Sequence, residues 1–450
     1  MSVKLVRGKV CLDKDRSGQG KCSKEVEFGQ GIELGRLNFI LGRNGSGKTL
    51  LTTLLNPAIT ALVPTSKVGC CNKQIYALLS ILGYSYLKWP LPFRTCAHMK
   101  LNNEELCVYG IIDFEVDCFH DLPSACSFSL LGQDILQSAE YAKDKPYFSS
   151  EKRSFDYFIC KKDSSDCINC EKLQCLRLMS YAKQCNDQVF INCVTEVPGL
   201  NFITLYYSPH LALVRSPLNL LPFYVSNLMY INRIGEFNNS GNAVNFVLNL
   251  SDIQNQDIKT MFDILAKVFG LDRLNNFIIY FKKGDADVKV SYEVKGRRSD
   301  RELNLKFEPW QIGDGQRAFI QLFLTALAAK IAETQGLRPI FILDSPEAFM
   351  HPDLIDFAAE LLMMLKSLIV VITQSNDVIE AVIANLNEDM VNDASRIKFY
   401  RVKRESKRNG DAVVVTKLDG IKVYNLLVSR VDLRKLITWE YIIYNDSETG

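Results

Sequence analysis

The chain has 450 residues, of which 47% are hydrophobic, so it is long enough for a large core and two or three domains. Its 53 basic and 51 acidic residues give a formal net charge of +2, which restricts any nucleic-acid binding to a local patch. The charged N-terminus lacks the apolar segment of a signal peptide, and no hydrophobic run reaches the length of a membrane span. The sequence therefore predicts a cytoplasmic protein without membrane segments.

The strongest motif follows an apolar strand that we expect at residues 37–41. There GRNGSGKT fits the phosphate-loop pattern and leads into a helix rich in Leu and Thr. The glycines let backbone amides converge on a phosphate, Lys48 can reach the β- and γ-phosphates, and the Thr49 hydroxyl can bind Mg²⁺. A glycine turn with a chance lysine is the alternative, which the flanking strand and helix disfavour. The predicted nucleotide-binding residues are Gly42, Arg43, Asn44, Gly45, Ser46, Gly47, Lys48 and Thr49.

The cysteines are concentrated in the first half, where all 14 lie between Cys11 and Cys193. A disulfide scaffold is disfavoured without a secretion signal. The densest cluster contains a Cys-x2-Cys turn with one cysteine on each side, a candidate zinc site with four thiolate ligands. Cys185 or Cys193 could replace one ligand, an iron–sulfur cluster has less support from the spacing, and scattered thiols remain the alternative. The candidate ligands are Cys160, Cys167, Cys170 and Cys175.

The second half contains three further segments that end in polar residues. A helix expected from residue 316 onward is preceded by IGDGQ, a glycine-rich start suited to an anion, although an ordinary capped helix is an alternative. A buried strand then ends in Asp344, where parallel sheets place their ligands and a carboxylate can hold Mg²⁺. The next strand, at residues 368–373, ends in Gln374. These three segments could form one continuous edge of a site.

Two clusters of basic residues could contact nucleic-acid phosphates. One is the run at residues 398–408, and the other comprises Lys295, Arg297, Arg298 and Arg301. We favour the interpretation that both are solvated strand edges, because lysines there discourage unwanted strand pairing.

In chain order, GRNGSGKT, IGDGQ, ILDSPEAFMHP and VITQSND resemble the motif set of ABC-type ATPases. More narrowly they are similar to the non-transporter branch, which includes the RecF, SMC and OLD (overcoming lysogenisation defect) families. The PEAFMHP tail is the most specific piece and is typical of the OLD-like branch. The resemblance covers residues 1–65 and about 225–400 and says little about residues 66–200.

The resemblance implies an ATPase head that binds ATP and Mg²⁺ and forms a homodimer with ATP at the interface. Residues 42–49 would hold the phosphates, and Thr49 and Asp344 would hold the metal. The γ-phosphate of the opposite subunit would be contacted by Gly313, Asp314, Gly315 and Gln316.

Three positions depart from the family pattern. Ser345 stands at the position of the general base, Gln374 at the position of the switch histidine, and Gly313 at the position of the signature serine. A serine hydroxyl is too weakly basic to replace a carboxylate, and loss of a general base costs a factor of about 10² to 10⁴. Glu347 could supply the base, and Gln374 could orient water as a glutamine does in small GTPases. The pattern therefore favours nucleotide binding with slow hydrolysis.

We accordingly expect an α/β fold of the ABC type, with a mixed sheet and flanking helices, plus an α-rich, Cys-containing insertion. The expected divisions are residues 1–65 and 226–450 for the head and 66–225 for the insertion, with the Cys cluster at 160–193. The expected function is an ATP-dependent switch in DNA maintenance or defence, working with nucleic acid or with a separate nuclease or effector chain. A catalytically degenerate scaffold or sensor that recruits an effector is the alternative.

Overall fold

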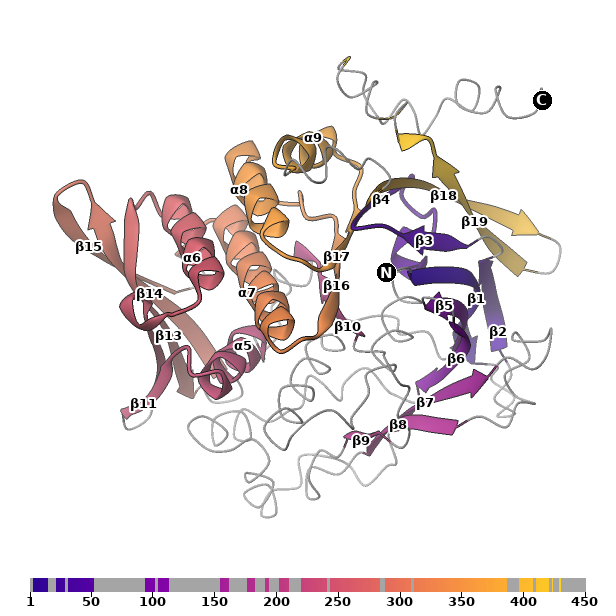
Figure 1. Cartoon of the computed structure of the whole chain (residues 1–450), viewed down its shortest axis with the longest axis horizontal. Helices are drawn as coiled ribbons and strands as arrows, with labels where there is room; N and C mark the ends of the chain where they lie inside the picture. The colour runs from indigo at the N-terminus through magenta and orange to yellow at the C-terminus, as the bar shows by residue number, and fades with distance from the viewer. Residues whose placement is uncertain are drawn as a thin grey trace.

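The computed structural model describes most of the C-terminal half and parts of the N-terminal half (Figure 1). The described residues are 3–14, 22–28, 31–51, 94–101, 104–112, 154–161, 176–182, 191–193, 202–209, 220–240, 243–283, 288–308, 311–386, 396–407, 410–420, 423 and 429.

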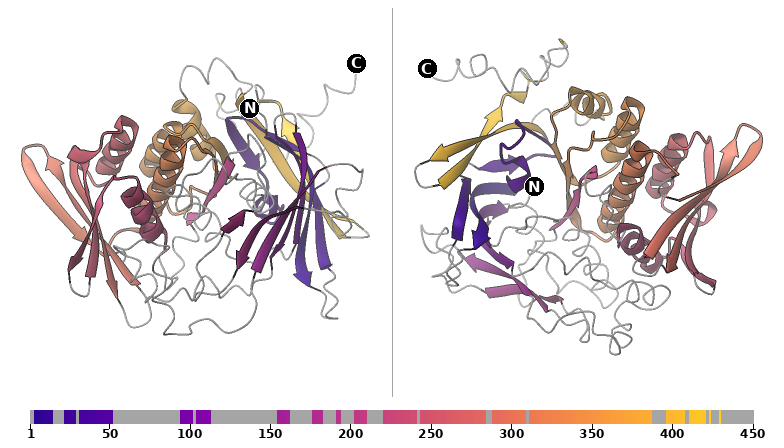
Figure 2. Two further views of the ribbon diagram at one scale, coloured as in Figure 1. Left: turned by 60° about the horizontal axis from the view of Figure 1, so that its bottom comes forward. Right: turned by 180° about the vertical axis from the view of Figure 1, so that it is seen from behind.

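Fourteen of the described strands form one mixed sheet in the order β10-β16-β17-β4-β18-β19-β2-β1-β5-β6-β7-β8-β9, with β3 paired to β1. Figure 2 shows this sheet curling at the end of the molecule that carries the N-terminus. Its strands are β1 (Val3–Lys14), β2 (Cys22–Phe28), β3 (Ile32–Leu34), β4 (Leu37–Leu41), β5 (Arg94–Leu101), β6 (Glu104–Ile112), β7 (Ser154–Lys161), β8 (Leu176–Ala182), β9 (Ile191–Cys193), β10 (Phe202–Tyr207), β16 (Arg338–Asp344), β17 (Leu368–Ile372), β18 (Ile397–Lys407) and β19 (Gly410–Leu418).

The parallel part of this sheet consists of β10, β16, β17, β4 and β18. All five residues of β4 are buried, as expected of a parallel strand covered on both faces, and its one polar residue, Asn38, is hydrogen-bonded to the backbone of Gly35 and Ile369. Asp344 pairs with Ile372, and Ile372 pairs with Ile40, so the carboxyl ends of three strands are in register. The loops that follow these strands therefore meet at one edge.

The described residues between 94 and 207 form strands β5 to β10, whereas we expected an α-rich insertion in residues 66–225. Strands β5 to β9 extend the sheet by antiparallel pairing. Strand β10 instead pairs in parallel with β16 and belongs to the sheet that carries Asp344. Of the cysteine cluster, Cys160 lies in β7, while Cys167, Cys170 and Cys175 lie outside the described residues.

A second, antiparallel sheet has the order β11-β12-β13-β14-β15. Helices α6, α7 and α8 lie between the two sheets (Figure 1). The strands are β11 (Glu236–Ser240), β12 (Ala243–Asn249), β13 (Arg273–Lys283), β14 (Val288–Arg298) and β15 (Arg301–Phe307). The helices are α5 (Leu220–Ile231), η4 (Leu250–Asp252), α6 (Gln256–Val268), α7 (Asp314–Thr334), α8 (Pro352–Met363) and α9 (Asn376–Ala384).

Helix α7 is the central helix of the core. Every residue from Ala318 to Ala332 is buried, so the helix has no solvated face over this length. It packs against α5, α6 and α8 and against strands β10 and β16. The aromatic contact between Phe262 of α6 and Phe323 of α7, with ring centroids 4.9 Å apart, joins the second sheet's layer to this helix.

These observations confirm the predicted α/β fold with a mixed sheet and flanking helices. The interpretation of residues 398–408 as a solvated strand edge is wrong for the first part of this run, because residues 397–401 pair with β4 and lie inside the sheet. Residues 402–407 pair with β19, and Arg408 lies outside the described residues. Tyr400 in this run is buried, and the Lys398 ammonium lies 3.2 Å from the Glu33 carboxylate. Within the described residues, no helix is long and apolar enough to cross a membrane.

Candidate nucleotide-binding site

The phosphate loop joins β4 to a helix that begins at Lys48. Gly45 and Gly47 have φ angles of 77° and 98°, a region that L side chains rarely adopt. A Cβ atom at Gly47 would also lie 2.7 Å from Val413 Cγ2 of β19. The turn is closed by the Ser46 amide, which donates to the Arg43 carbonyl oxygen (3.1 Å). The glycines thus permit the tight backbone path that a phosphate cradle requires.

The Lys48 side chain folds back over this loop. Its ammonium donates to the carbonyl oxygens of Gly42 (2.7 Å) and Arg43 (2.8 Å) and is largely buried. Burial lowers the pKa of Lys48, while the nearby carboxylates of Asp344 and Glu347 act in the opposite direction. The amine is therefore held at the mouth of the loop, between loop carbonyls and two carboxylates.

Asp344 accepts hydrogen bonds from three hydroxyl groups. The Thr49 hydroxyl (2.9 Å) and the Tyr206 hydroxyl (2.8 Å) both donate to Oδ2, and the Ser345 hydroxyl lies 3.3 Å from Oδ1. Thr49 belongs to the phosphate loop, so this contact joins two motifs that are 295 residues apart in sequence. The structure brings these two predicted magnesium ligands together.

Sequence reasoning missed Tyr206, which lies on β10 in the region assigned to the insertion. Burial, together with the adjacent Asp344 carboxylate, raises the pKa of Tyr206 well above its ordinary value. The phenol is thus a protonated hydrogen-bond donor to the carboxylate. Its only sequence signal is the apolar run FITLYY, which reads as a buried strand but does not reveal the strand's neighbour.

Ser345 and Glu347 lie on the turn that follows β16. Ser345 has a φ angle of 55°, and its amide donates to the Ile372 carbonyl oxygen (2.8 Å), which fixes the turn against β17. Glu347 is mostly buried, and its Oε1 accepts from the Gln374 amide (3.4 Å). Burial raises the pKa of Glu347 above the ordinary value, and the Asp344 charge adds to this, while hydrogen bonds from Thr373 and Gln374 oppose it. Glu347 is therefore a carboxylate of raised basicity next to the Asp344 site.

Gln374 connects two edges of the site. It follows β17, which lies between β4 and β16, and its Nε2 donates to Asn44 Oδ1 in the phosphate loop (2.5 Å). The backbone of the same residue contacts Glu347. Both residues that we predicted to be catalytic, Glu347 and Gln374, thus lie beside the phosphate loop and Asp344.

Residues 313–316, which we predicted to contact the nucleotide of the opposite subunit, lie at the start of α7. Gly313 and Asp314 are exposed at the start of α7, and Asp314 pairs with Arg317 (3.0 Å). Gln316 Nε2 donates to the Val268 carbonyl oxygen of α6 (3.4 Å). A Cβ atom at Gly315 would lie 2.7 Å from the Phe349 carbonyl oxygen, so the helix start packs against the turn after Glu347. Within this chain these residues contact α6 and that turn, and Gly313 faces outward.

The residues present fit a nucleotide with Mg²⁺. Hydroxyl and carboxylate oxygens are the ligands that Mg²⁺ prefers, and Thr49 and Asp344 supply one of each. The buried Ser46 Oγ and Glu347 Oε2 have no hydrogen-bond partner in the part of the chain that the structure describes, which is expected of groups that serve a bound ligand or water. For zinc, no group of three or more His, Cys, Asp or Glu side chains that could hold a metal occurs among the described residues.

Comparisons with known proteins give limited information about this site. Residues 278–416, less than half of the chain, match the family described as "Protein of unknown function (DUF2813)". No curated protein sequence matches the chain.

Solved structures similar to this chain include heads of SMC proteins. The SMC head domain from Thermotoga maritima has a TM-score of 0.33 and 11% identity, and the match covers 92% of this chain and 98% of that one. The Smc head from Pyrococcus furiosus, with an extended coiled coil and bound to the C-terminal domain of ScpA, has a TM-score of 0.32 and 10% identity, covering 95% and 99%. A structure described under ATP-driven dimerization and DNA-stimulated activation of SMC ATPases has a TM-score of 0.23 and 14% identity, covering 40% and 97%. These values are low, so the functional argument depends on the chain's own residues.

Proposed function

We propose that this chain binds ATP with Mg²⁺ at the phosphate loop and acts as an ATP-dependent switch. The observation that supports this most strongly is the 2.9 Å hydrogen bond between the Thr49 hydroxyl and Asp344 Oδ2. These two oxygen atoms come from the phosphate loop and from the carboxyl end of another parallel strand, which is the arrangement that P-loop nucleotide hydrolases use to hold the metal.

Bound Mg²⁺ would neutralise the negative charge that develops on the transferred phosphoryl group. The loop amides at residues 42–49 would hold the phosphates, and Lys48 would exchange its contacts with the Gly42 and Arg43 carbonyl groups for phosphate oxygens. Tyr206 keeps the Asp344 carboxylate oriented, since its phenol donates to the same oxygen atom as Thr49.

Glu347 is the best-placed general base for slow hydrolysis. Its carboxylate is buried next to Asp344, and its Oε2 has no hydrogen-bond partner among the described residues, so it would accept the proton of a water molecule that enters the site with the nucleotide. Gln374 donates to Asn44 in the phosphate loop and could instead orient that water. Ser345 uses its hydroxyl at Asp344 and offers no base.

The exposed start of α7 favours a head-to-head homodimer. Among the described residues no atom lies within 4 Å of a Cβ added at Gly313, which supports an open surface there for the nucleotide of a second subunit. The resemblance of the motifs to RecF, SMC and OLD-like ATPases extends the proposal to DNA maintenance or defence, with nucleic acid or a separate nuclease or effector chain as partner. Zinc binding by the cysteine cluster stays a prediction from sequence.

Binding and turnover of radiolabelled ATP test this proposal. The parent chain should bind one ATP per chain in the presence of Mg²⁺ and release phosphate slowly. Lys48→Ala and Asp344→Asn should each weaken binding at least about tenfold, since each removes a charge-assisted contact. Lys417→Ala, at an exposed lysine of β19, is the control and should bind as the parent does. Undiminished binding by Lys48→Ala would show that the phosphate loop is not the nucleotide site.

A non-enzymatic scaffold or sensor is the second candidate, because Ser345 replaces the general base of the family pattern. It predicts that the parent chain retains ATP stoichiometrically and releases no phosphate over many hours. Phosphate release that disappears in Lys48→Ala would exclude this candidate.

A further inference from the structure

A polar cavity lies at the amino ends of the parallel strands, opposite the edge that carries the phosphate loop. Its volume is about 620 Å³, and strands β4, β16, β17 and β18 all begin at its wall. Because β4 has five residues at roughly 3.3 Å each, this edge lies on the order of 17 Å from the phosphate loop. The cavity is therefore separate from the candidate nucleotide site described above.

Positive charge dominates the lining of this cavity. The lining includes five basic and two acidic residues, which are Arg36, Arg338, Lys366, Arg396, Lys398, Glu33 and Glu333. A concave surface lined mainly by one sign of charge concentrates the electric field and attracts ions of opposite charge. The charge balance alone thus favours an anion.

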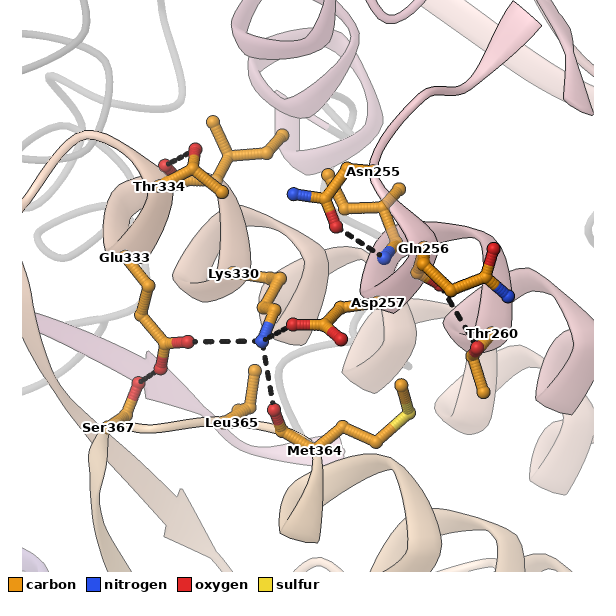
Figure 3. A network of polar contacts seen from close by, with 12 residues as sticks. Asn255, Gln256, Asp257, Thr260, Lys330, Glu333, Thr334, Met364, Leu365 and Ser367 are labelled. Carbon is orange, nitrogen blue, oxygen red and sulfur yellow. Dashed lines mark hydrogen bonds and ion pairs between the residues drawn. The ribbon is translucent and has the colours of Figure 1, made fainter.

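Both acidic residues already have cationic partners. Glu33 lies 3.2 Å from the Lys398 ammonium. Glu333 lies 3.5 Å from Lys330, which reaches it from within α7, and accepts a hydrogen bond from the Ser367 hydroxyl (2.6 Å), as Figure 3 shows. Because Lys330 is not part of the lining, Glu333 is partly neutralised from behind, and the cavity keeps an excess of positive charge.

Arg36 forms a fixed cationic part of the wall. Its guanidinium donates to the carbonyl oxygens of Leu365 and Ser367, which orient the group without cancelling its charge. Burial is the main cause that lowers the pKa of Arg36; Glu333 opposes this, and the like charge of Arg396 adds to it. Arg396 also belongs to the lining, so an anion bound in the cavity would lie near two guanidinium groups.

The turn before β4 holds the cavity in shape. The buried Asn38 accepts from the Gly35 amide (2.7 Å) and donates to the Gly35 and Ile369 carbonyl oxygens (3.0 and 2.9 Å). A Cβ atom at Gly35 would lie 2.5 Å from the Arg396 carbonyl oxygen, so the turn packs directly on β18. The basic side chains thus project from a wall that is already organised.

We propose that this cavity binds a free nucleotide through its phosphate groups. Its volume is typical of small-ligand pockets, which favours a small molecule over a duplex lying on a flat surface. Arginine is suited to phosphate because its guanidinium can donate two parallel hydrogen bonds. Leu34, Leu337 and Pro339 add an apolar wall for the base.

Equilibrium dialysis of radiolabelled ADP tests the proposal in the full chain carrying Lys48→Ala, which disables the phosphate loop. One ADP per chain should still bind. The additional exchange of two exposed cavity residues, Arg338→Glu with Arg396→Glu, should weaken this binding at least about tenfold, because each loses a charge-assisted contact. Lys289→Glu, an exposed charge reversal on β14 of the second sheet, which contributes no residue to the cavity lining, should leave it unchanged. AMP should compete with ADP, and adenosine should not.

The proposal is overturned if the Lys48→Ala chain binds no ADP or if the double reversal leaves ADP binding intact. It is equally overturned if adenosine competes as well as AMP, or if a short DNA duplex displaces ADP more strongly than AMP at equal phosphate concentration. Thermal melts check folding, and if the double variant does not fold, the single Lys366→Glu variant replaces it with an expected loss of at least about threefold. This test does not depend on whether ATP binds at the phosphate loop.

Discussion

Three hydroxyl groups surround the Asp344 carboxylate. Those of Thr49 and Ser345 belong to sequence motifs, whereas that of Tyr206 does not. We predict that Tyr206→Phe weakens Mg²⁺-dependent ATP binding about tenfold, because a hydrogen bond to a charged group contributes about 1.5–3 kcal/mol. The ring would stay in place, and Asp344 would lose one of the two donors to Oδ2. A Mg²⁺ titration of nucleotide binding measures this effect.

Tyr207 offers a matched control on the same strand. Its buried hydroxyl donates to the Ala318 carbonyl oxygen (2.8 Å) of α7 and does not touch Asp344. Tyr207→Phe removes the same atom and should leave the Mg²⁺ dependence unchanged. An equal loss of Mg²⁺ dependence in both variants would show that Tyr206 acts through general packing rather than through Asp344.

The second prediction for a single residue concerns Glu347, the proposed general base. Glu347→Gln should lower the rate of ATP hydrolysis by a factor of about 10² or more and leave ATP binding near the parent value, because the amide keeps the shape and cannot accept the proton. Single-turnover measurements on prebound ATP separate the two effects. Hydrolysis at the parent rate in Glu347→Gln would move the search for the base to another residue.

Some residues of the candidate site can be predicted from the sequence, and others cannot. Thr49 and Asp344 follow from their motifs, because a phosphate loop and a strand-end aspartate have local patterns. Tyr206 cannot be found in this way, since its role comes from the pairing of β10 with β16, residues 202–207 with 338–343, which no local pattern encodes. The displaced carboxylate of Glu347 was named from sequence, but its direction depends on the turn at Ser345, whose positive φ is not evident from residue type.

At the scale of elements, one buried lysine joins three segments. Lys330 of α7 contacts Asp257 of α6 (2.8 Å), Glu333 (3.5 Å) and the Met364 carbonyl oxygen after α8 (3.0 Å), as drawn in Figure 3. We predict that Lys330→Ala lowers the free energy of unfolding by about 3 kcal/mol, because it leaves the buried Glu333 without this cation. The shift of the urea midpoint measures this loss.

Lys267→Ala serves as the comparison for this variant. Lys267 of α6 pairs with Glu360 of α8 at 3.1 Å, but both side chains are more than one-third exposed. An exposed ion pair contributes about 0–1 kcal/mol, so the urea midpoint should move far less than in Lys330→Ala. Equal shifts in the two variants would contradict a special role of the buried network.

Helices and strands can be predicted from the sequence where a local pattern of residues identifies them. The apolar runs of β4, β16 and β17 identify buried parallel strands, and the register of Asp344, Ile372 and Ile40 gives the shared edge that the polar strand ends suggested. The edge position predicted for the basic run of β18 is wrong at residues 398–401, because charged residues also occur in a strand segment that has neighbours on both sides. The strands between residues 94 and 182 join the sheet through the antiparallel pairing of β5 with β1, which is distant in sequence and which composition does not reveal.

At the scale of the whole molecule, the exposed surface at the start of α7 has no role within the described part of a single chain. Gly313 and Asp314 are exposed, and Phe349 beside them is about half exposed with a φ angle of 70°. An exposed, strained aromatic residue next to an uncapped helix start is a feature of contact surfaces. This surface is therefore the place to test the proposed dimer.

We predict that Gly313→Arg abolishes ATP-dependent dimerisation and leaves the monomer intact. Gly313 has a φ angle of −61°, and no atom of the described residues lies within 4 Å of an added Cβ, so the arginine fits the monomer and should obstruct only an approaching partner. Light scattering of the Glu347→Gln chain with ATP and Mg²⁺ should show a dimer, and the same chain with Gly313→Arg should stay monomeric while binding ATP. Ala384→Arg, which adds the same side chain at the exposed end of α9, should dimerise normally. A Gly313→Arg chain that still dimerises would place the interface elsewhere, because the arginine side chain would fill the space that the nucleotide of the partner subunit occupies in the proposed dimer.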